Sequence, residues 1–315
     1  MRIVFCGTPE FAVPTLRALV TNPEFAVEAV VTQPDRPRGR GQQVTASPVK
    51  EAALAAHARI YQPESVKTDE ARDFFAEIKP DAAVIIAYGQ IVPRRLLEIP
   101  RLGWMNLHAS LLPKYRGAAP IAWAIINGES KTGLTTMRLD PGLDTGPMLM
   151  QRETEIGSDE TAPELAKRMA ETGAPLVMES LVKLERGEIV PIPQDASLAS
   201  YAPMLAKEHG RIDWGQTADE IYNRIRGLAP WPGAFTTFRG RLCHVWGRPA
   251  AYAASDVIIA QEPGSVILRD GGIEAVCGRG TRLQLEAVQA EGRKRISARE
   301  FANGARLASG ERFGG

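Results

Sequence analysis

The chain has 315 residues, of which 44% are hydrophobic, and it carries 38 Lys and Arg residues against 37 Asp and Glu. This length suffices for two domains with separate cores, and a net charge of +1 gives no overall attraction to a polyanion, so any nucleic-acid contact must be local. Three scattered cysteines without a CxxC pair, and the lack of an apolar stretch near the roughly 20 residues of a membrane span, exclude a disulfide framework, a zinc cage and a membrane helix. We expect a cytoplasmic protein without a signal peptide.

The first half of the chain alternates short apolar runs with helical patterns. Strands are predicted at Arg2–Cys6, Val27–Val31, Ala82–Ala87 and Trp104–His108, and helices at Phe11–Asn22, Pro48–Ala58 and Thr68–Ile78. This alternation predicts an α/β domain with a mostly parallel sheet flanked by helices.

The second half changes in character after residue 187. Before that point the pattern predicts a helix at Ala119–Asn127, strands at Gly133–Leu139 and Met148–Glu155, and a long helix at Thr161–Arg186 that closes the first domain. Residues 188–207 are rich in Pro and Ser and are typical of an extended linker. Short β-rich runs follow at Gly233–Phe238, Leu242–Trp246, Gly264–Leu268, Ile273–Val276 and Leu283–Val288. We therefore predict domains at 1–187 and 208–315, the second a small barrel or sandwich.

Charge divides unevenly between these parts. Residues 207–315 hold 16 Lys and Arg against 12 Asp and Glu, whereas residues 1–206 hold 22 against 25. An excess this small is as easily explained by ordinary surface variation as by an anionic partner.

Two polar residues end the fourth predicted strand. The two-residue period of a strand places Asn106 and His108 on one face and Leu107 on the other. Ligands bind at the carboxyl ends of strands in open α/β sheets, so an amide donor and an imidazole at this position have a plausible common target. A hydrogen-bonded pair that only finishes the strand is the alternative.

A carboxylate loop follows the next predicted strand. In Asp140–Gly146 (DPGLDTG), two glycines allow a tight turn that brings Asp144 toward the same edge of the sheet. Asp140 stands beside Pro-Gly, where Asp commonly caps a turn, so it is left out of the catalytic set.

The sequence does not favour metal or redox chemistry. None of the four histidines has another at ligand spacing, and the first strand leads into Gly7-Thr8-Pro9 in place of the dinucleotide motif GxGxxG. Metal-free group transfer is the chemistry that we predict.

Several motifs together resemble the folate-dependent formyltransferase superfamily. They are Asn106–Pro113 (NLHASLLP), Arg116-Gly117 and the Asp140–Gly146 loop, and they include the family's catalytic Asn, His and Asp, here Asn106, His108 and Asp144. The segments Gly7–Pro9, Gln33–Gly41 (QPDRPRGRG) with Ser47–Lys50, Arg116–Ile121 and Leu143–Gly146 narrow the resemblance to the branch that acts on methionyl-tRNA. Pro230–Pro232 resembles the start of that family's C-terminal domain, and the similarity runs essentially end to end. The resemblance implies a Rossmann-like catalytic domain followed by an OB-like domain that helps hold tRNA.

The resemblance also implies substrates and roles. The formyl donor would be 10-formyltetrahydrofolate and the acceptor the α-amine of initiator methionyl-tRNA, with His108 moving protons, Asn106 stabilising a developing oxyanion, and Asp144 orienting His108 directly or through a water. Folate contacts are expected from Ala87, Tyr88, Gly89, Ser110, Leu111, Leu112, Pro113 and Asp140. Contacts to tRNA are expected from Arg36, Arg38, Arg40 and Lys50 and from the basic turn Arg293, Lys294 and Arg295. No metal is expected, and we expect a monomer.

Three other readings remain open at this point. Cations beside glycines and prolines in Pro34–Lys50 predict a mobile basic loop. A formyltransferase for a sugar-nucleotide or purine-precursor amine would share the three catalytic residues and differ in this loop. A formyl-folate hydrolase would use water in place of the amine. A non-catalytic RNA-binding protein on the same scaffold would have no need of three polar residues at one edge.

Overall fold

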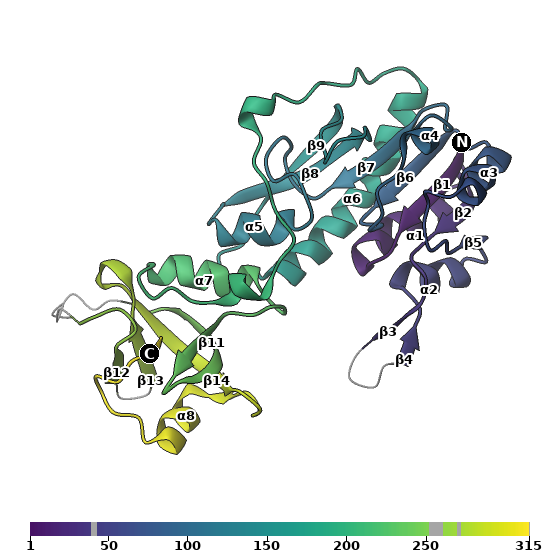
Figure 1. Cartoon of the computed structure of the whole chain (residues 1–315). Coiled ribbons are helices and arrows are strands. Elements are labelled where there is room, and N and C mark those ends of the chain that lie inside the picture. The colour runs from purple at the N-terminus through teal and green to yellow at the C-terminus, as the bar shows by residue number, and fades with distance from the viewer. Residues whose placement is uncertain (39–42, 252–260, 270–271, 315) are drawn as a thin grey trace. The chain divides into compact units, whose positions relative to one another are not determined.

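The computed structural model describes residues 1–38, 43–251, 261–269 and 272–314 (Figure 1). The chain forms two compact units: the first contains Met1–Pro120, Lys131–Glu155 and Glu164–Ala202, and the second contains Ile121–Ser130, Ile156–Pro163 and Pro203–Gly315. The short segments 121–130 and 156–163, which we assigned to the first domain from the sequence, therefore group with the C-terminal unit. The two units are described separately.

The first unit is built on a seven-stranded sheet with the order β5-β2-β1-β6-β7-β8-β9. The parallel strands are β1 (Arg2–Gly7), β2 (Ala26–Val31), β5 (Ile60–Tyr61), β6 (Ala82–Ile86) and β7 (Trp104–His108), and the antiparallel strands are β8 (Lys131–Arg138) and β9 (Met148–Glu155). The mostly parallel sheet predicted from the sequence is confirmed. Strands β1 and β6 are almost wholly buried because helices cover the sheet, which explains their continuous apolar runs.

The described residues of this unit form the helices α1 (Val13–Thr21), α2 (Pro48–Ala55), α3 (Asp69–Ile78), α4 (Arg94–Leu97) and α6 (Ala162–Glu185). Side-chain caps explain two of the starts, since Ser47 accepts a hydrogen bond from the amide of Lys50 and Thr68 accepts one from that of Ala71. The predicted helix at Phe11–Asn22 begins as a short 3-10 turn, Glu10–Ala12.

Helix α6 decides which way the side chains of β7 point. A Cβ at Gly173 would lie 2.6 Å from Leu107 Cδ2, so the helix backbone packs directly on Leu107. The strand period then places Asn106 and His108 on the opposite face of the sheet.

A small hairpin precedes α2 and was not predicted. Strands β3 (Arg36–Arg38) and β4 (Gln43–Thr45) pair antiparallel, with Arg36 opposite Thr45. The Pro and Gly residues of Pro34–Lys50 predict a loop, and the paired strands correct that prediction.

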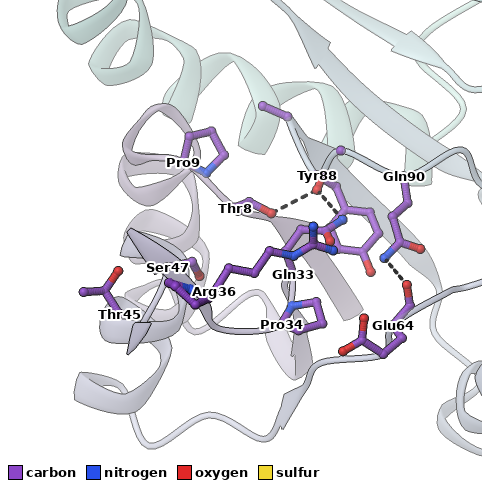
Figure 2. A pocket seen from close by; sticks show the side chains of 13 residues that line it. Thr8, Pro9, Gln33, Pro34, Arg36, Thr45, Ser47, Glu64, Tyr88 and Gln90 are labelled. Atoms are coloured by element: carbon purple, nitrogen blue, oxygen red, sulfur yellow. Dashed lines mark hydrogen bonds between the residues drawn. The ribbon is translucent and has the colours of Figure 1, made fainter. Parts of the chain in front are cut away.

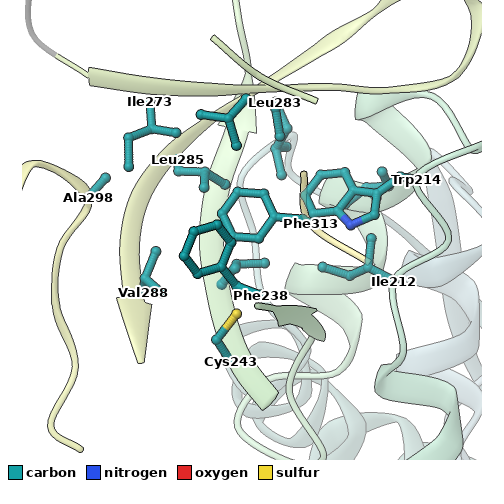
Figure 3. Packing of buried hydrophobic residues seen from close by; sticks show 14 of the residues in the cluster. Ile212, Trp214, Phe238, Cys243, Ile273, Leu283, Leu285, Val288, Ala298 and Phe313 are labelled. Carbon is teal, nitrogen blue, oxygen red and sulfur yellow. The ribbon is translucent and has the colours of Figure 1, made fainter. Parts of the chain in front are cut away.

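The second unit is an antiparallel β domain. Strands β10 (Phe235–Phe238), β11 (Arg241–Pro249), β14 (Arg282–Ala290), β13 (Gly272–Val276) and β12 (Val266–Arg269) lie in that order, and β15 (Ile296–Ser297) also pairs with β14. The aromatic rings of Trp214, Phe238 and Phe313 pack together in its core, with Phe313 between the other two (Figure 3). The predicted small β domain is confirmed.

The described part of this unit also contains the helices α7 (Ala218–Gly227) and α8 (Ala298–Ala305) and most of α5 (Pro120–Ile126). Only α5 was predicted. Both missed helices begin with a capping box, Thr217 with Glu220 and Ser297 with Glu300, in which each side chain bonds the other residue's backbone amide.

Candidate active site

His108, at the carboxyl end of β7, is held through one of its two ring nitrogens. Its Nε2 lies 2.9 Å from the carbonyl oxygen of Tyr115 in a buried contact. A carbonyl can only accept, so Nε2 carries the hydrogen and donates it. In the neutral ring the lone pair is therefore on Nδ1, which is the nitrogen free to take up a proton.

Asp144 faces that free nitrogen. Asp144 Oδ2 lies 3.7 Å from His108 Nδ1, and the two side chains are 19% and 6% exposed. The distance is too long for a direct hydrogen bond but short enough for a strong charge interaction once the imidazole is protonated. The same Oδ2 accepts a 2.8 Å hydrogen bond from the amide of Gly117, which fixes the carboxylate.

Asn106 lies two residues before His108 on the same face of β7. Its side chain is partly exposed, and it makes no hydrogen bond to any residue that the structure describes. An amide with both its donor and its acceptor free at a strand end is available to a substrate. The structure thus brings Asn106, His108 and Asp144 to one edge of the sheet.

The segment predicted as a plain linker contributes to this centre. Gln194 Nε2 donates 2.8 Å hydrogen bonds to the carbonyl oxygens of Asp144 and Gly146, and its Oε1 accepts from the guanidinium of Arg116 at 2.8 and 3.0 Å. Ser200 Oγ accepts from the amide of Tyr115 at 2.9 Å. The sequence carries no local signal for these contacts, because each joins residues that lie about 50 to 85 positions apart.

Ser110 and Asp140, two of the polar residues expected to touch folate, have protein partners. Ser110 is fully buried and its hydroxyl donates to the carbonyl of Lys114 at 2.6 Å. Asp140 accepts hydrogen bonds from the hydroxyl of Thr145 at 2.8 Å and from the amide of Gly142 at 3.1 Å, as a turn-capping carboxylate does. Their contacts to folate, and those of Leu111, Leu112 and Pro113, remain predictions.

A cavity of about 650 Å³ opens at the carboxyl ends of β1, β2 and β6 (Figure 2). Its lining combines residues predicted for both ligands: Ala87, Tyr88 and Gly89 from the expected folate segment, and Arg36 from the expected tRNA segment. Thr8 and Gln33 donate to the carbonyl of Tyr88 at 2.9 and 3.2 Å and hold this wall in place. Since β6 pairs with β7, with Ile85 beside Asn106, the cavity adjoins the His108 edge of the same sheet.

The Tyr88 side chain belongs to the core as well as to this wall. It is 2% exposed, its hydroxyl has no hydrogen-bond partner among the described residues, and burial raises its pKa. The phenol therefore stays neutral, and the exposed neighbours Ala87 and Gly89 are the parts of this wall that are open to a ligand.

The cations predicted for tRNA differ in setting. Arg36 is exposed and lines the cavity, whereas Lys50 is paired with Asp35, whose pKa is lowered chiefly by the hydrogen bond from Lys50 and then by that from Gln62. Arg40 lies outside the described residues, and Arg38 is placed only as part of β3.

In the second unit the predicted basic turn is exposed at Arg293, Lys294 and Arg295. The guanidinium of Arg295 lies 4.0 Å from the ring centre of Trp246 on β11. A cation on an indole face is a geometry that suits both protein stability and RNA contact.

No group of three His, Cys, Asp or Glu side chains that could hold a metal occurs among the residues with described positions. In the same part of the chain, no helix is long and apolar enough to cross a bilayer.

Comparison with known proteins assigns the family. Residues 1–181 match the family described as formyl transferase, and residues 204–306 match the formyl transferase C-terminal domain. The chain belongs to the formyl transferase family. It is 55% identical over 314 residues to a methionyl-tRNA formyltransferase of Solibacter usitatus and 50% identical over 315 residues to one of Acidobacterium capsulatum, and these alignments cover 100% of this chain and 99% and 100% of the relatives.

The fold recurs in solved structures. The sugar 3N-formyl transferase WlaRD, solved in the presence of dTDP and 5-N-formyl-THF, aligns with a TM-score of 0.64 at 18% identity and covers 93% of this chain and 99% of its own. At 18% identity, this likeness shows only that the two chains share a fold.

Proposed function

We propose that the protein transfers the formyl group of 10-formyltetrahydrofolate to the α-amine of initiator methionyl-tRNA. The observation that carries this proposal is the edge of the sheet where Asn106, His108 and Asp144 meet. Full-length identity of about half to methionyl-tRNA formyltransferases supports the same substrates. Translation initiation in the cytoplasm is the setting, and a monomer suffices for the reaction because all three residues come from one unit of one chain.

His108 moves the proton in this mechanism. An α-amine titrates near ~7.7–8.0, so a useful neutral fraction exists at neutral pH and can attack the formyl carbon. As the new C–N bond forms, the amine loses a proton, which His108 Nδ1 accepts because Nε2 is committed to Tyr115. The carboxylate of Asp144 then stabilises the imidazolium, and the proton passes to the departing folate nitrogen.

Asn106 acts on the oxygen of the formyl group. During attack that oxygen becomes negative, and the Asn106 amide, which has no protein partner among the described residues, can donate to it. A neutral donor suits this role because it keeps the same protonation state throughout the reaction.

The cavity beside β6 is where we place the approach of the two substrates. Ala87, Gly89 and the cation of Arg36 all line it, so it offers both backbone hydrogen bonds for a planar ligand and charge for a phosphate. In the C-terminal unit, the exposed turn Arg293–Arg295 is the proposed second tRNA contact.

A formyl-transfer assay tests this function. With formyl-folate and charged initiator tRNA, we expect formylmethionyl-tRNA, and with uncharged tRNA no product. Formylation of a sugar-nucleotide amine or a purine-precursor amine at a higher kcat/KM, or formate release that needs no tRNA, would instead assign one of the rival activities.

A further inference from the structure

We propose that Gln194 and Ser200 are positioning residues of the His108 centre, acting through the two groups that contact the two ring nitrogens. The proposal rests on the proposed function, because it takes His108 and Asp144 as catalytic. Two side chains of the segment that composition alone marks as a linker, those of Gln194 and Ser200, thereby support the catalytic groups.

Gln194 holds the Asp144 side of the centre. Asp144 has a positive φ of 51°, a left-handed conformation that few residues other than Gly, Asn and Asp adopt and that the surrounding contacts must hold in place. The Gln194 amide supplies that constraint by donating to the carbonyls on both sides of Thr145, those of Asp144 and Gly146. Without these bonds the loop is free to relax and carry the carboxylate away from His108 Nδ1.

Gln194 is itself fixed at both ends. Arg116, which is 5% exposed, grips its Oε1 with two guanidinium nitrogens. Two residues earlier, Ile192 and Met148 exchange backbone hydrogen bonds of 2.8 Å in each direction at the start of β9. The side chain therefore reaches the Asp144 loop in one defined orientation.

Ser200 holds the other side of the imidazole. Tyr115 has a φ of 60°, and its amide donates to Ser200 Oγ while its carbonyl accepts from His108 Nε2. The next residue, Arg116, makes two backbone hydrogen bonds that keep the two segments in register: its amide donates to the carbonyl of Ser200 at 2.8 Å, and its carbonyl accepts from the amide of Ala202 at 2.7 Å.

Gly117 shows how closely the two segments approach. Its φ is +117°, and a Cβ there would lie 2.8 Å from the carbonyl oxygen of Ala202. The amide of this same residue donates to Asp144 Oδ2, so the packing of the linker also aims that donor. The linker thus determines the positions of the Tyr115 carbonyl, the Gly117 amide and the Asp144 loop together.

Gln194→Glu separates positioning from folding. The new carboxylate keeps an acceptor for Arg116 and gains a charge-assisted pair, so the fold is retained, but it has no hydrogen to donate to the Asp144 and Gly146 carbonyls. We expect kcat to fall roughly 10- to 100-fold, the scale of a displacement of about 1 Å at a reacting group, with KM for both substrates within about two-fold of wild type. Leu198→Ala, an exposed position on the same segment, is the matched control and should keep the wild-type kcat.

A double-mutant cycle then asks whether Gln194 acts through Asp144. In an Asp144→Asn background, Gln194→Ala should cost less than about two-fold in kcat, because the group that it positions has already been disabled. Equal losses in both backgrounds would overturn the proposal, as would a wild-type kcat in Gln194→Glu and Gln194→Ala, or a loss that disappears when rates are corrected for the folded fraction.

Ser200→Ala supplies an independent spectroscopic test. Nitrogen-15 NMR of the imidazoles should show His108 as the Nε2–H tautomer in the wild type and a mixture of tautomers in Ser200→Ala, while His57 keeps one spectrum in both. An unchanged His108 spectrum with unchanged kcat would overturn the role of Ser200. Formyl transfer by the wild-type protein is measured separately, so a failed proposal here and a failed proposed function give different results.

Discussion

The His108 centre and the Gln33–Lys50 segment use charge in different ways. Around His108, both ring nitrogens face fixed groups, and Asp144 is held by a backbone amide and by a braced loop. In the Gln33–Lys50 segment, Arg36 is exposed and lines a cavity, whereas the ammonium of Lys50 is paired with the carboxylate of Asp35. Proton transfer depends on geometry within a fraction of an ångström, whereas attraction of a phosphate depends mainly on the number and sign of charges nearby.

We expect the largest effect from removing the imidazole of His108. His108→Ala should lower kcat by about 10²–10⁴, the usual range for loss of a general base, with little change in KM for folate. Because His108 is buried and donates to Tyr115, we also expect a loss of about 1–3 kcal/mol in the free energy of unfolding.

His57→Asn is the control for this substitution. His57 is exposed with a φ of 53°, a conformation that Asn tolerates, so kcat and stability should both stay near wild type. Turnover by His108→Ala within a few-fold of wild type would remove His108 from the mechanism.

Asn106→Ala should cause the next largest loss of kcat, but without the loss of stability expected for His108→Ala. Loss of one oxyanion donor typically costs ~10²–10³ in kcat, and Asn106 has no hydrogen-bond partner among the described residues, so the free energy of unfolding should hardly change. Rapid-quench measurement of the chemical step checks the expected loss of kcat, and thermal denaturation checks the expected unchanged stability. A marked loss of folded protein at normal kcat would show that Asn106 only finishes the strand.

The sequence predicted the sheet better than the connections between its strands. The bounds of β7 and β9 match the prediction because apolar periodicity and strand burial are local properties. The β3–β4 hairpin was missed since Pro and Gly suggested a loop, and α7 and α8 were missed although the capping boxes at Thr217 and Ser297 could have signalled their starts.

In the candidate site, too, the residues placed by a local pattern could be predicted and those placed by distant contacts could not. Asn106 and His108 could be placed together because one strand carries both, and the turn residues of Asp140–Gly146 pointed to a carboxylate loop. Gln194 and Ser200 could not be found, because a polar side chain in a Pro-rich segment has no periodicity and its partners lie far away in sequence. Whether the predicted residues perform the assigned roles is a question for the kinetic tests.

In the Gln33–Lys50 segment we expect a smaller effect, confined to one substrate. Arg36→Ala should raise KM for charged tRNA several-fold and leave KM for formyl-folate unchanged, because its charge serves a phosphate and not the pterin. One lost phosphate contact should also reduce the slope of log affinity against log salt by roughly 0.7–0.9. Arg94→Ala removes the same charge from an exposed helix of the same unit and should change neither quantity. If wild type and Arg36→Ala have equal slopes of log affinity for tRNA against log salt, Arg36 does not contact a phosphate, and the C-terminal unit would have to supply the tRNA contacts.

We expect the smallest effect from disrupting the pair of Asp35 and Lys50 in that segment. Asp35 accepts hydrogen bonds from Lys50 and Gln62, and these lower its pKa, so the ionised carboxylate is favoured in the folded state. A group with a lowered folded pKa stabilises the protein above its unfolded pKa, near ~3.9 for Asp, and this stabilisation is lost as pH falls through the folded value. Asp35→Asn should therefore lower Tm slightly at pH 7, and the difference from wild type should shrink as the pH is brought down through about 4 toward the lowered folded pKa. Because the substitution also frees the ammonium of Lys50, binding of charged tRNA at low salt should be as strong as in wild type or stronger. Weaker tRNA binding in Asp35→Asn at unchanged Tm would show that the Lys50–Asp35 pair shapes the RNA contact itself, and the segment would then depend on fixed geometry as the His108 centre does.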